Sequence, residues 1–469
     1  MSVVYIHKTK TTEYAPYPFE PEQLYPEYPF HNPALSTENE VYAAVRNCLI
    51  GLDLDKENYG SSTWNPLRDY LSPGQTVLIK PNLVMDHNEN NQYRDNLDCL
   101  VTHPSCLRAV CDYCVIALKN QGKIIIADAP MQGCQFEVLR KKLFLDDLIQ
   151  YYAERGVQIE LRDLREFEAD CRHGVIAGKK YTDSKGIIVH LGTQSTHYRS
   201  GSNEKYQVSD YSLEETQKYH HADVHDYYIA ETVLQADLII NFSKPKTHRL
   251  AGFTGAMKNM IGITYNKASL PHRTAGSPES GGDAYRSKSA LKMTADHMLD
   301  KKIRAESRNY SGQALFYRYA YGLFRRLGDY IKGEKSFYGS WPGNETIWRT
   351  ILDLNKVVSY ADKNGTMQST IQRKHLCFGD MIVSGERNGP VAPTPKKLGI
   401  ILASDSPASF DILLCKLMGF RYESIPLIRE VRKEKKEIDI RSNVGNLQGR
   451  LEDIEIPTDW TFEPHDMWK

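Results

Sequence analysis

The side chains best suited to chemistry are concentrated between Ser243 and Gly262. This segment contains six basic or amide side chains and no Asp or Glu: Lys244, Lys246, His248, Arg249, Lys258 and Asn259. Lysine supplies a positive point charge, and Gly252 and Gly255 let backbone N–H groups come close to a bound molecule. These properties favour a cradle for a carboxylate or phosphate group. A solvated basic loop is the alternative, but the lack of compensating acids makes us favour a ligand site.

Further polar residues follow segments with the pattern of strands. In open α/β sheets, ligands bind beyond the carboxyl ends of the strands, and VLIKPN, IIIADAP, LIINFSKPKTH and GIILASD each end an apolar run with polar side chains. The expected ligand-binding residues are Lys80, Asn82, Ser243, Lys244, Lys246, Gly255, Asn259, Asp353, Asn355, Asp405 and Asp411. We expect catalysis from His248, Lys258 and Asp128, with His248 as the general acid or base. Oxygen donors such as those of Asp353, Asn355 and Asp411 suit Mg²⁺ beside a phosphate.

A second group of metal-binding side chains lies at 219–226, where the sequence is YHHADVHD. On a helix, His221 and His225 would share one face, and three imidazoles with two carboxylates could bind zinc. No fourth ligand is evident, so we favour a polar, solvated helix here. The motifs GxxxxGK[ST], GxGxxG, GxSxG and HExxH are all absent from the sequence.

The nine cysteines are scattered and odd in number, which argues against a secreted disulfide framework. Cys111 and Cys114 form a CxxC, but the apolar residues around them recur at helical spacing. We therefore expect both thiols in the core. No second CxxC completes a zinc or iron–sulfur ligand set, so the sequence predicts no iron–sulfur cluster.

The candidate residues need a sheet to bring them together. From about residue 75, strand-like apolar runs alternate with helical segments, which is typical of βαβ units. We expect an α/β fold with a largely parallel sheet, helices on both faces, and two lobes that leave a cleft at the carboxyl ends of the strands. The expected parts are a Pro/Tyr-rich extended arm with the first helix (1–74), an α/β core (75–283), a basic helical insertion (284–349), and the rest of the core with the C-terminal tail (350–469).

Composition narrows the class of protein. The chain has 469 residues, a formal net charge of zero and 41% hydrophobic residues, which is ordinary for a globular protein. The neutral balance argues against a nucleic-acid binder. No apolar run reaches the roughly 18 residues of a membrane span, and the N-terminus has no signal-peptide pattern. We therefore expect a cytoplasmic protein.

The insertion at 284–349 is richer in Lys and Arg than in Asp and Glu, and residues 316–332 combine aromatic and basic side chains. A basic aromatic helix could lie weakly on an anionic membrane surface. Asp329 and the glycines dilute this pattern, so we favour a helix that covers the sheet and extends its arginine heads into solvent.

The chain resembles the DUF362 family over most of residues 75–420. The matching stretches are VLIKPNLV (77–84), VTHPSCLRAV (101–110), ADLIINFSKPKTHRLAGFTGAMKNMIGI (236–263), DLNKV (353–357), GERNGPVAP (385–393) and LASDSPASFD (402–411). The third stretch is the longest and most specific. The resemblance implies a fold and a site, but no particular activity, because the family has no settled one. Some members carry a ferredoxin-type module, whose CxxCxxCxxxC is absent here.

The run KTHRLAGFTGAMK and the later His272 are more distantly similar to the pHxxxGxxGGxK…H pattern of the nickel-pincer lactate racemases. By this resemblance, His248 would be an acid/base, Lys258 would hold the pyridine-derived cofactor, and His272 would be a metal ligand to nickel. Two positions depart from the pattern. Ala256 replaces a glycine, and Asp128 stands where the racemases have their other catalytic histidine, which counts against racemisation itself.

We therefore expect an enzyme, of unresolved reaction type, that binds an anionic small molecule carrying a carboxylate or phosphate. The residues favour an isomerase or a transferase, and their side chains are suited to Mg²⁺ or Ni²⁺. The alternatives are a racemase or epimerase related to the nickel-pincer enzymes, a non-catalytic binding protein, and an accessory protein at a membrane.

Overall fold

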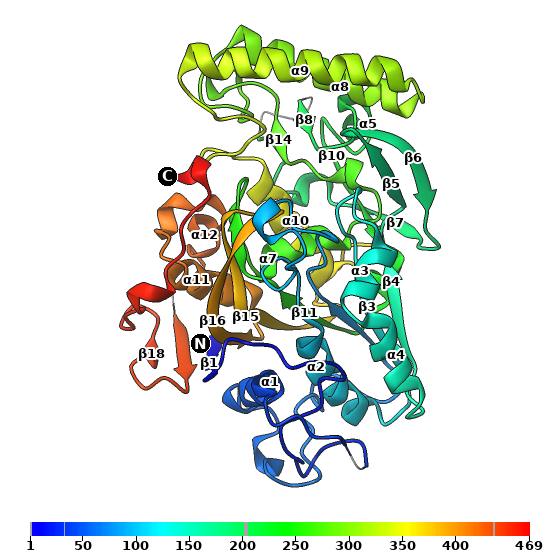
Figure 1. Ribbon diagram of the computed structural model, residues 1–469, viewed down its shortest axis with the longest axis vertical. Coiled ribbons are helices and arrows are strands. Elements are labelled where there is room, and N and C mark those ends of the chain that lie inside the picture. Colours follow the sequence, from blue (N-terminus) through cyan, green and yellow to red (C-terminus); the bar gives the residue numbers. More distant parts are fainter. Residues whose placement is uncertain (1, 32, 201–204, 435–436) are drawn as a thin grey trace.

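The computed structural model in Figure 1 describes residues 2–31, 33–200, 205–434 and 437–469. A large mixed sheet runs through it in the order β18-β17-β1-β16-β15-β11-β2-β3-β4, with the short β12 and β13 attached. The strands are β1 (Ser2–Lys8), β2 (Thr76–Lys80), β3 (Lys123–Asp128), β4 (Ile159–Asp163), β11 (Leu238–Ser243), β12 (Lys246–His248), β13 (Gly252–Thr254), β15 (Lys374–Asn388), β16 (Ala392–Ser404), β17 (Ile438–Ser442) and β18 (Gly449–Arg450).

One half of this sheet is parallel. Strands β15, β11, β2, β3 and β4 are successive neighbours and run in the same direction. Their apolar runs at 77–79, 124–126 and 238–240 are buried, as expected for parallel strands that helices cover on both faces. The predicted α/β fold with a mostly parallel sheet is confirmed.

The other half is largely antiparallel. β16 runs antiparallel to both β15 and β1. β1 lies between β16 and β17, and pairs with β17 in parallel. Strands from the first and last parts of the chain are therefore neighbours in the middle of this half.

Helices pack on both faces of the sheet. Val77 and Ile79 point into a core shared with α1, α2, α3 and α4, whereas Leu78, between them, faces a core shared with α6 and α10. This alternation is the period of a strand. Helices α11 and α12 pack beside β1 and β16. The bounds of these and the other helices of the core are α1 (Glu40–Gly51), α2 (Pro104–Leu118), α3 (Phe136–Lys142), α4 (Leu145–Ala153), α5 (Leu213–Gln217), α6 (Glu231–Gln235), α7 (Ala256–Asn259), α10 (Ile347–Tyr360), α11 (Pro407–Leu417) and α12 (Pro426–Val431).

Helix α2 holds the CxxC in the core. Pro104 begins the helix and His103 caps it, because its Nδ1 accepts a hydrogen bond from the Ser105 N–H. Cys111 and Cys114 are both free and fully buried. The prediction that these thiols face the core is confirmed.

The segment at 219–226 is a β-hairpin, so the helix predicted there is wrong. β9 (His220–His221) pairs with β10 (Val224–Ala230), which in turn pairs with β7 (Gly186–His190). Successive side chains of a strand point to opposite faces, so His221 is exposed while its neighbour His220 is buried beside His225 of β10. The remaining strands are β5 (Phe167–Arg172), β6 (Val175–Tyr181), β8 (Tyr206–Gln207) and β14 (Arg273–Thr274).

The Pro/Tyr-rich segment before α1 has no helix or strand between residue 9 and residue 39, in the part that the structure describes. It is held against the body by buried polar contacts. Arg108 Nη2 of α2 lies 3.0 Å from Glu20 Oε2, and the ring of Tyr14 stacks on His103 at a centroid distance of 3.8 Å.

Candidate functional site

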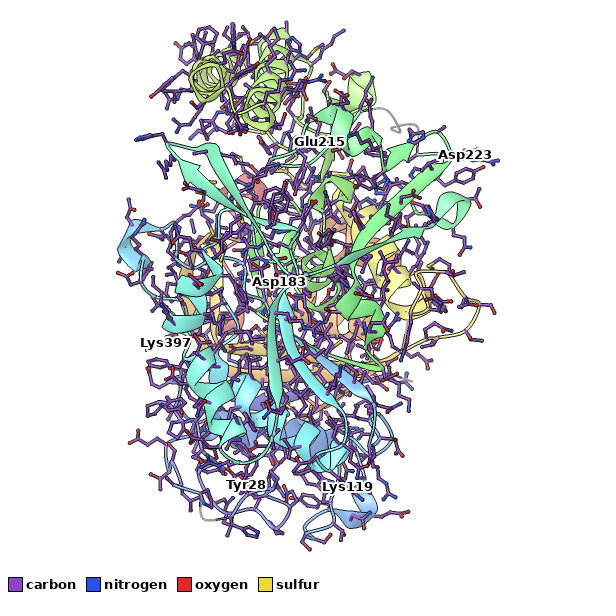
Figure 2. The ribbon with its side chains drawn as sticks, turned by 90° about the vertical axis from the view of Figure 1, so that its right-hand side faces the viewer. Tyr28, Lys119, Asp183, Glu215, Asp223 and Lys397 are labelled. Carbon is purple, nitrogen blue, oxygen red and sulfur yellow. The ribbon has the colours of Figure 1, made fainter. Side chains whose placement is uncertain are left out.

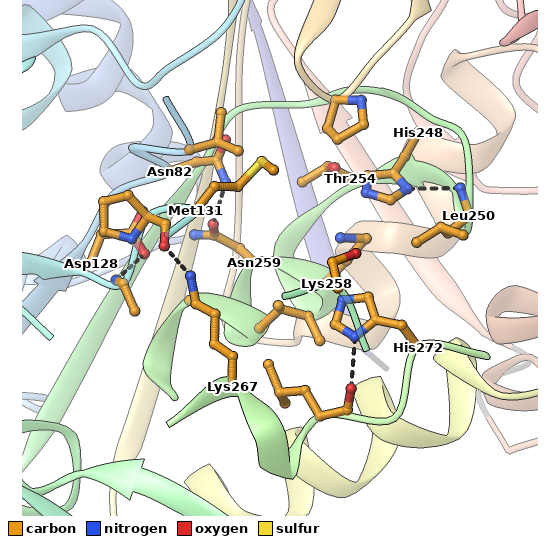
Figure 3. A pocket seen from close by; sticks show the side chains of 18 of the residues that line it. Asn82, Asp128, Met131, His248, Leu250, Thr254, Lys258, Asn259, Lys267 and His272 are labelled. Carbon is orange, nitrogen blue, oxygen red and sulfur yellow. Dashed lines mark hydrogen bonds between the residues drawn. The ribbon is translucent and has the colours of Figure 1, made fainter. Parts of the chain in front are cut away.

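A pocket lies beyond the carboxyl ends of β2, β3 and β11 (Figure 3). These strands are adjacent and parallel, so their last residues Lys80, Asp128 and Ser243 lie at one edge of the sheet. The pocket has a volume of about 160 Å³, enough for several waters or a small metabolite. Its polar lining includes Asn82, Asp128, Asp210, Lys246, His248, Arg249, Thr254, Lys258, Asn259, Lys267 and His272.

Asp128 forms a buried ion pair with Lys80, whose Nζ lies 2.6 Å from Asp128 Oδ1. The same carboxylate accepts backbone N–H groups from Leu83 at 2.5 Å and Ala129 at 2.8 Å. Burial lowers the pKa of Lys80, and the neighbouring carboxylate opposes that shift. Asp128 is thus committed to three donors and fixes the loop after β2 against the end of β3.

Three asparagines and Lys246 connect the elements around the pocket. Asn259 Nδ2 donates to Asn241 Oδ1 at 2.8 Å, and Asn82 Nδ2 donates to Asn259 Oδ1 at 3.0 Å. Lys246 Nζ donates to Asn82 Oδ1 at 2.5 Å and to the Leu100 carbonyl. Burial and the positive charge of Lys244 lower the pKa of Lys246 well below its ordinary value. Both of these oxygens are neutral, and Lys246 forms no ion pair with a residue that the structure describes, so an anion in the pocket would be its first charged partner.

His248 and His272 both line the pocket (Figure 3), and the hydrogen bonds of their Nδ1 atoms assign them opposite tautomers. His248 Nδ1 accepts backbone N–H groups from Leu250 at 3.0 Å and Ala251 at 3.3 Å, so its proton is on Nε2. His272 Nδ1 donates to the Leu270 carbonyl at 2.8 Å, which leaves its Nε2 as an acceptor. Burial lowers the pKa of His272 to about 3 and that of His248 well below its usual value, so both rings are neutral at physiological pH. One ring offers a donor and the other a proton acceptor.

Two further lysines of the lining, Lys258 and Lys267, have pKa values near 7. Burial, with a contribution from Arg249, lowers the pKa of Lys258 to about 7. Burial, followed by the charge of Arg165, does the same for Lys267, whose Nζ donates to the Pro130 carbonyl. An amine with a pKa near 7 can give or take a proton at physiological pH.

The short helix α7, which carries Lys258 and Asn259, is positioned by residues behind it. Asp411 accepts the backbone N–H groups of Ala256 at 2.6 Å and Met257 at 3.0 Å. Gly255 makes room for that carboxylate, since a Cβ there would lie 2.1 Å from Asp411 Oδ1. Burial raises the pKa of Asp411 to about 7 against the effect of these hydrogen bonds.

Of the eleven predicted ligand-binding residues, Asn82, Lys246 and Asn259 line the pocket, and the other eight lie outside its lining, each for a local reason. Lys244 Nζ is buried 2.9 Å from Asp380 Oδ2 and 2.9 Å from the Tyr14 hydroxyl, so it joins the N-terminal segment to β15. Ser243 Oγ donates to the Phe378 carbonyl at 3.0 Å. Asp405 is exposed.

The position of Asp405 follows from strand direction. Because β16 runs antiparallel to β15, the chain that leaves its carboxyl end heads away from the edge at which β2, β3 and β11 end. The expectation that Asp405 joins the other strand-end residues is wrong for this reason. Asp353 belongs to a different buried network, in which its carboxylate accepts the Thr196 N–H at 2.6 Å and the Tyr227 hydroxyl at 3.0 Å.

Asn355 and Asp411 act from behind the site. Asn355 Nδ2 donates to the Met257 carbonyl at 3.0 Å, so it holds α7 as Asp411 does. Lys80 also stands behind the lining, where it contacts Asp128 and Asn259. Among the titratable residues of the lining, Asp210 and Lys267 are the two that neither the sequence patterns nor the resemblance indicates. Lys267 follows the recognised segment by only five residues, and a Lys in a loop is too ordinary a signal to single out.

Within the described residues, no three His, Cys, Asp or Glu side chains lie close enough together to hold a metal ion. The other histidine of the pocket besides His272 is His248, and its Nδ1 accepts hydrogen bonds from the backbone. The carboxylate of Asp128 is paired with Lys80. The side chains present therefore do not form a nickel or magnesium site by themselves. The chemistry available to this chain's own residues is anion binding and proton transfer.

One comparison with protein families bears on these residues. The model described as "Domain of unknown function (DUF362)" matches residues 77–416. The chain belongs to the DUF362 family. The matched region begins at β2 and ends within α11, so it contains every element that lines the pocket or supports α7. The comparison with curated proteins gave no match. Membership in the DUF362 family thus agrees with the resemblance noted in the sequence and assigns no activity.

Proposed function

We propose that this DUF362 protein binds a small carboxylated or phosphorylated molecule in the pocket and transfers a proton to or from it. The observation that carries the proposal is a group of three lysines, Lys246, Lys258 and Lys267, that line one pocket; the first two are buried and the third is half-buried. None of the three forms an ion pair with a residue that the structure describes. An isolated buried ammonium group is costly, so a ligand of negative charge is the partner that would stabilise all three.

The same pocket contains a matched set of proton donors and acceptors. Lys258, with its pKa of about 7, can hold or release a proton near neutral pH. His272 offers Nε2 as an acceptor and His248 offers Nε2–H as a donor. We propose Lys258 as the general acid or base, with His248 as a hydrogen-bond donor to the bound anion. Lys246 and Asn82 would bind the charged end of the ligand.

A second candidate is proton transfer at a carbon next to a carboxylate, as in racemases and epimerases. The presence of His248, Lys258 and His272 in one pocket favours it, because these are the three positions of the nickel-pincer resemblance. Asp128, where those enzymes have a further histidine, is engaged with Lys80. Incubation of the protein with 2-hydroxy acids in D₂O, followed by NMR, would detect exchange at the carbon. Absence of exchange with every acid tested would remove this candidate.

The test of binding uses phosphate, lactate and pyruvate as probes in a thermal-shift and calorimetric series. We expect at least one probe to stabilise the protein and Lys258→Met to weaken its binding at least about tenfold. Methionine has a similar length without the charge, so this variant keeps the buried packing. Lys433→Met is the matched control, because Lys433 is a surface residue paired with Glu430.

Two results would overturn the proposal. One is that none of the probes binds and that no small molecule released from natively purified protein, as identified by mass spectrometry, is an anion. The other is equal binding by Lys258→Met and Lys433→Met. Turnover of a bound probe separates an enzyme from a carrier that uses the same pocket.

A further inference from the structure

Two long helices form one end of the molecule, away from the pocket. α8 (Ala290–Ser307) and α9 (Ser311–Lys332) pack side by side across the upper end of the longest axis (Figures 1 and 2). Ala314 and Gly328 are the two residues of α9 that are fully buried. Most of α9 is thus available to solvent or to a partner.

The outward face of α9 is apolar. Six large hydrophobic side chains are between 41% and 86% exposed: Phe316, Tyr319, Leu323, Leu327, Tyr330 and Ile331. Their spacing is mainly three and four residues, so they share one side of the helix. We call these six residues the α9 stripe. A contiguous exposed row of this kind marks a surface that contacts something apolar.

The charges near the stripe are sorted by sign. The acids of this region face inward: Asp329 and Glu334 lie 3.4 Å and 3.0 Å from the buried Lys292 Nζ. Four exposed bases, Arg308, Arg326, Lys332 and Lys335, have no ion pair with any residue in the described ranges. The surface around the α9 stripe is therefore basic, and its complement is an anionic surface.

We propose that the α9 stripe docks on an anionic lipid membrane. The helix would lie in the plane of the interface, with Phe316, Leu323 and Ile331 in the upper acyl region and the flanking bases against lipid phosphates. Tyr319 and Tyr330 have the amphipathic rings that favour this depth. The helix does not cross the bilayer: no described helix is both long and apolar enough to span one.

A second copy of the chain is a poorer occupant of the α9 stripe. In a two-fold dimer the same patch meets itself, so Arg326 and Lys332 would face the like charges of the other copy. No exposed acid on the stripe would compensate them. A bilayer containing anionic lipid removes the same apolar surface from water and also neutralises these bases. This inference is independent of the proposed ligand pocket.

The experiment is flotation of the full-length protein with vesicles of phosphatidylcholine alone or mixed with phosphatidylserine. We expect flotation with the mixed vesicles that salt weakens. Phe316→Ser/Leu323→Ser should lower the partition coefficient at least about tenfold. Leu24→Ser/Ile371→Ser is the matched control, since these apolar residues are 62% and 67% exposed while Phe316 and Leu323 are 66% and 57% exposed. Arg326→Glu/Lys332→Glu should abolish the preference for phosphatidylserine.

The outcomes are distinct. Loss of binding in the Phe316/Leu323 variant, with normal binding by the control and unchanged melting temperatures, supports the proposal. Failure of the unaltered protein to float with either vesicle overturns it. So does a concentration-dependent dimer, seen by analytical ultracentrifugation, that the Phe316/Leu323 variant disrupts, because the stripe would then be an interface between copies.

Discussion

At the scale of single residues, Lys258 and Lys267 would couple the proposed anion binding to protonation. Each amine has its pKa lowered to about 7 by burial, so half of each population is neutral near that pH in the free protein. A bound anion stabilises the ammonium form of each lysine. At a pH above about 7, anion binding is therefore accompanied by the uptake of protons from solution. The pocket is therefore sensitive to pH in the physiological range without using a protonated histidine.

We expect anion affinity to fall as the pH rises above about 7, by up to about tenfold per pH unit for each lysine that must be protonated. Calorimetry in two buffers of different ionisation enthalpy would report the protons taken up. An affinity that is constant from about pH 7 to about pH 9 would contradict the assignment.

The same shifts affect stability with a defined sign. The ordinary pKa of Lys is 10.5, so between about 7 and 10.5 the unfolded chain binds more protons at these two sites than the folded protein does. The contribution of Lys258 and Lys267 to the free energy of unfolding therefore rises with pH through this window.

The Lys80–Asp128 pair should behave as a single buried unit. Asp128→Asn leaves an ammonium group buried without its counter-charge, and we expect it to lower the free energy of unfolding by about 3–5 kcal/mol. Adding Lys80→Met to that variant should recover part of the loss, because the orphaned charge is gone. Urea denaturation of the two single variants and the double variant measures this coupling, and strictly additive losses would show that the pair is not coupled.

At the scale of elements, α7 depends on what lies behind it. Gly255→Ala would place a methyl group against Asp411 Oδ1, so the carboxylate must withdraw from the backbone of α7. We expect a loss of about 1–3 kcal/mol in stability, together with weaker anion binding, since Lys258 moves with the helix. Gly322→Ala in α9 is the control: nothing lies within 4 Å of the added Cβ, and it should stabilise by up to about 1 kcal/mol. Equal effects on melting temperature would contradict this account.

Sequence patterns predict the elements of the parallel half and of the pocket well. Runs such as 77–79 and 238–240 are apolar on both faces, and this can be read locally. The direction of β16 cannot be read locally, because the pattern LGIILAS is compatible with a strand in either orientation. For that reason the sequence places Asp405 with the other strand-end residues, where the structure does not. The YHHADVHD segment was predicted as a helix because a short polar run satisfies both helical and strand periods. The sequence does not single out Lys267, because its place in the pocket depends on contacts with residues far from it in the chain, such as the Pro130 carbonyl.

At the scale of the whole molecule, the Pro/Tyr-rich segment is attached to the body through buried charges. Glu20→Gln removes the charge that faces Arg108. We expect this variant to be cleaved several-fold faster between residues 9 and 39 in limited proteolysis, because an opened segment whose described residues form no helix or strand is accessible to protease. Glu38→Gln, at an exposed position in the same segment, is the control. Equal cleavage rates for the two variants would show that Glu20 does not hold the segment.

The position of β1 between β16 and β17 also determines when this strand can be fully paired during synthesis. Residues 2–8 leave the ribosome long before residues 438–442, which form one of their two neighbours in the sheet. Until then, one edge of β1 has unpaired N–H and C=O groups, which is the kind of edge that pairs with other chains. Ribosome pausing before residues 438–442 are made should therefore increase aggregation of the nascent protein. A chaperone that shields β1 would be needed until those residues emerge.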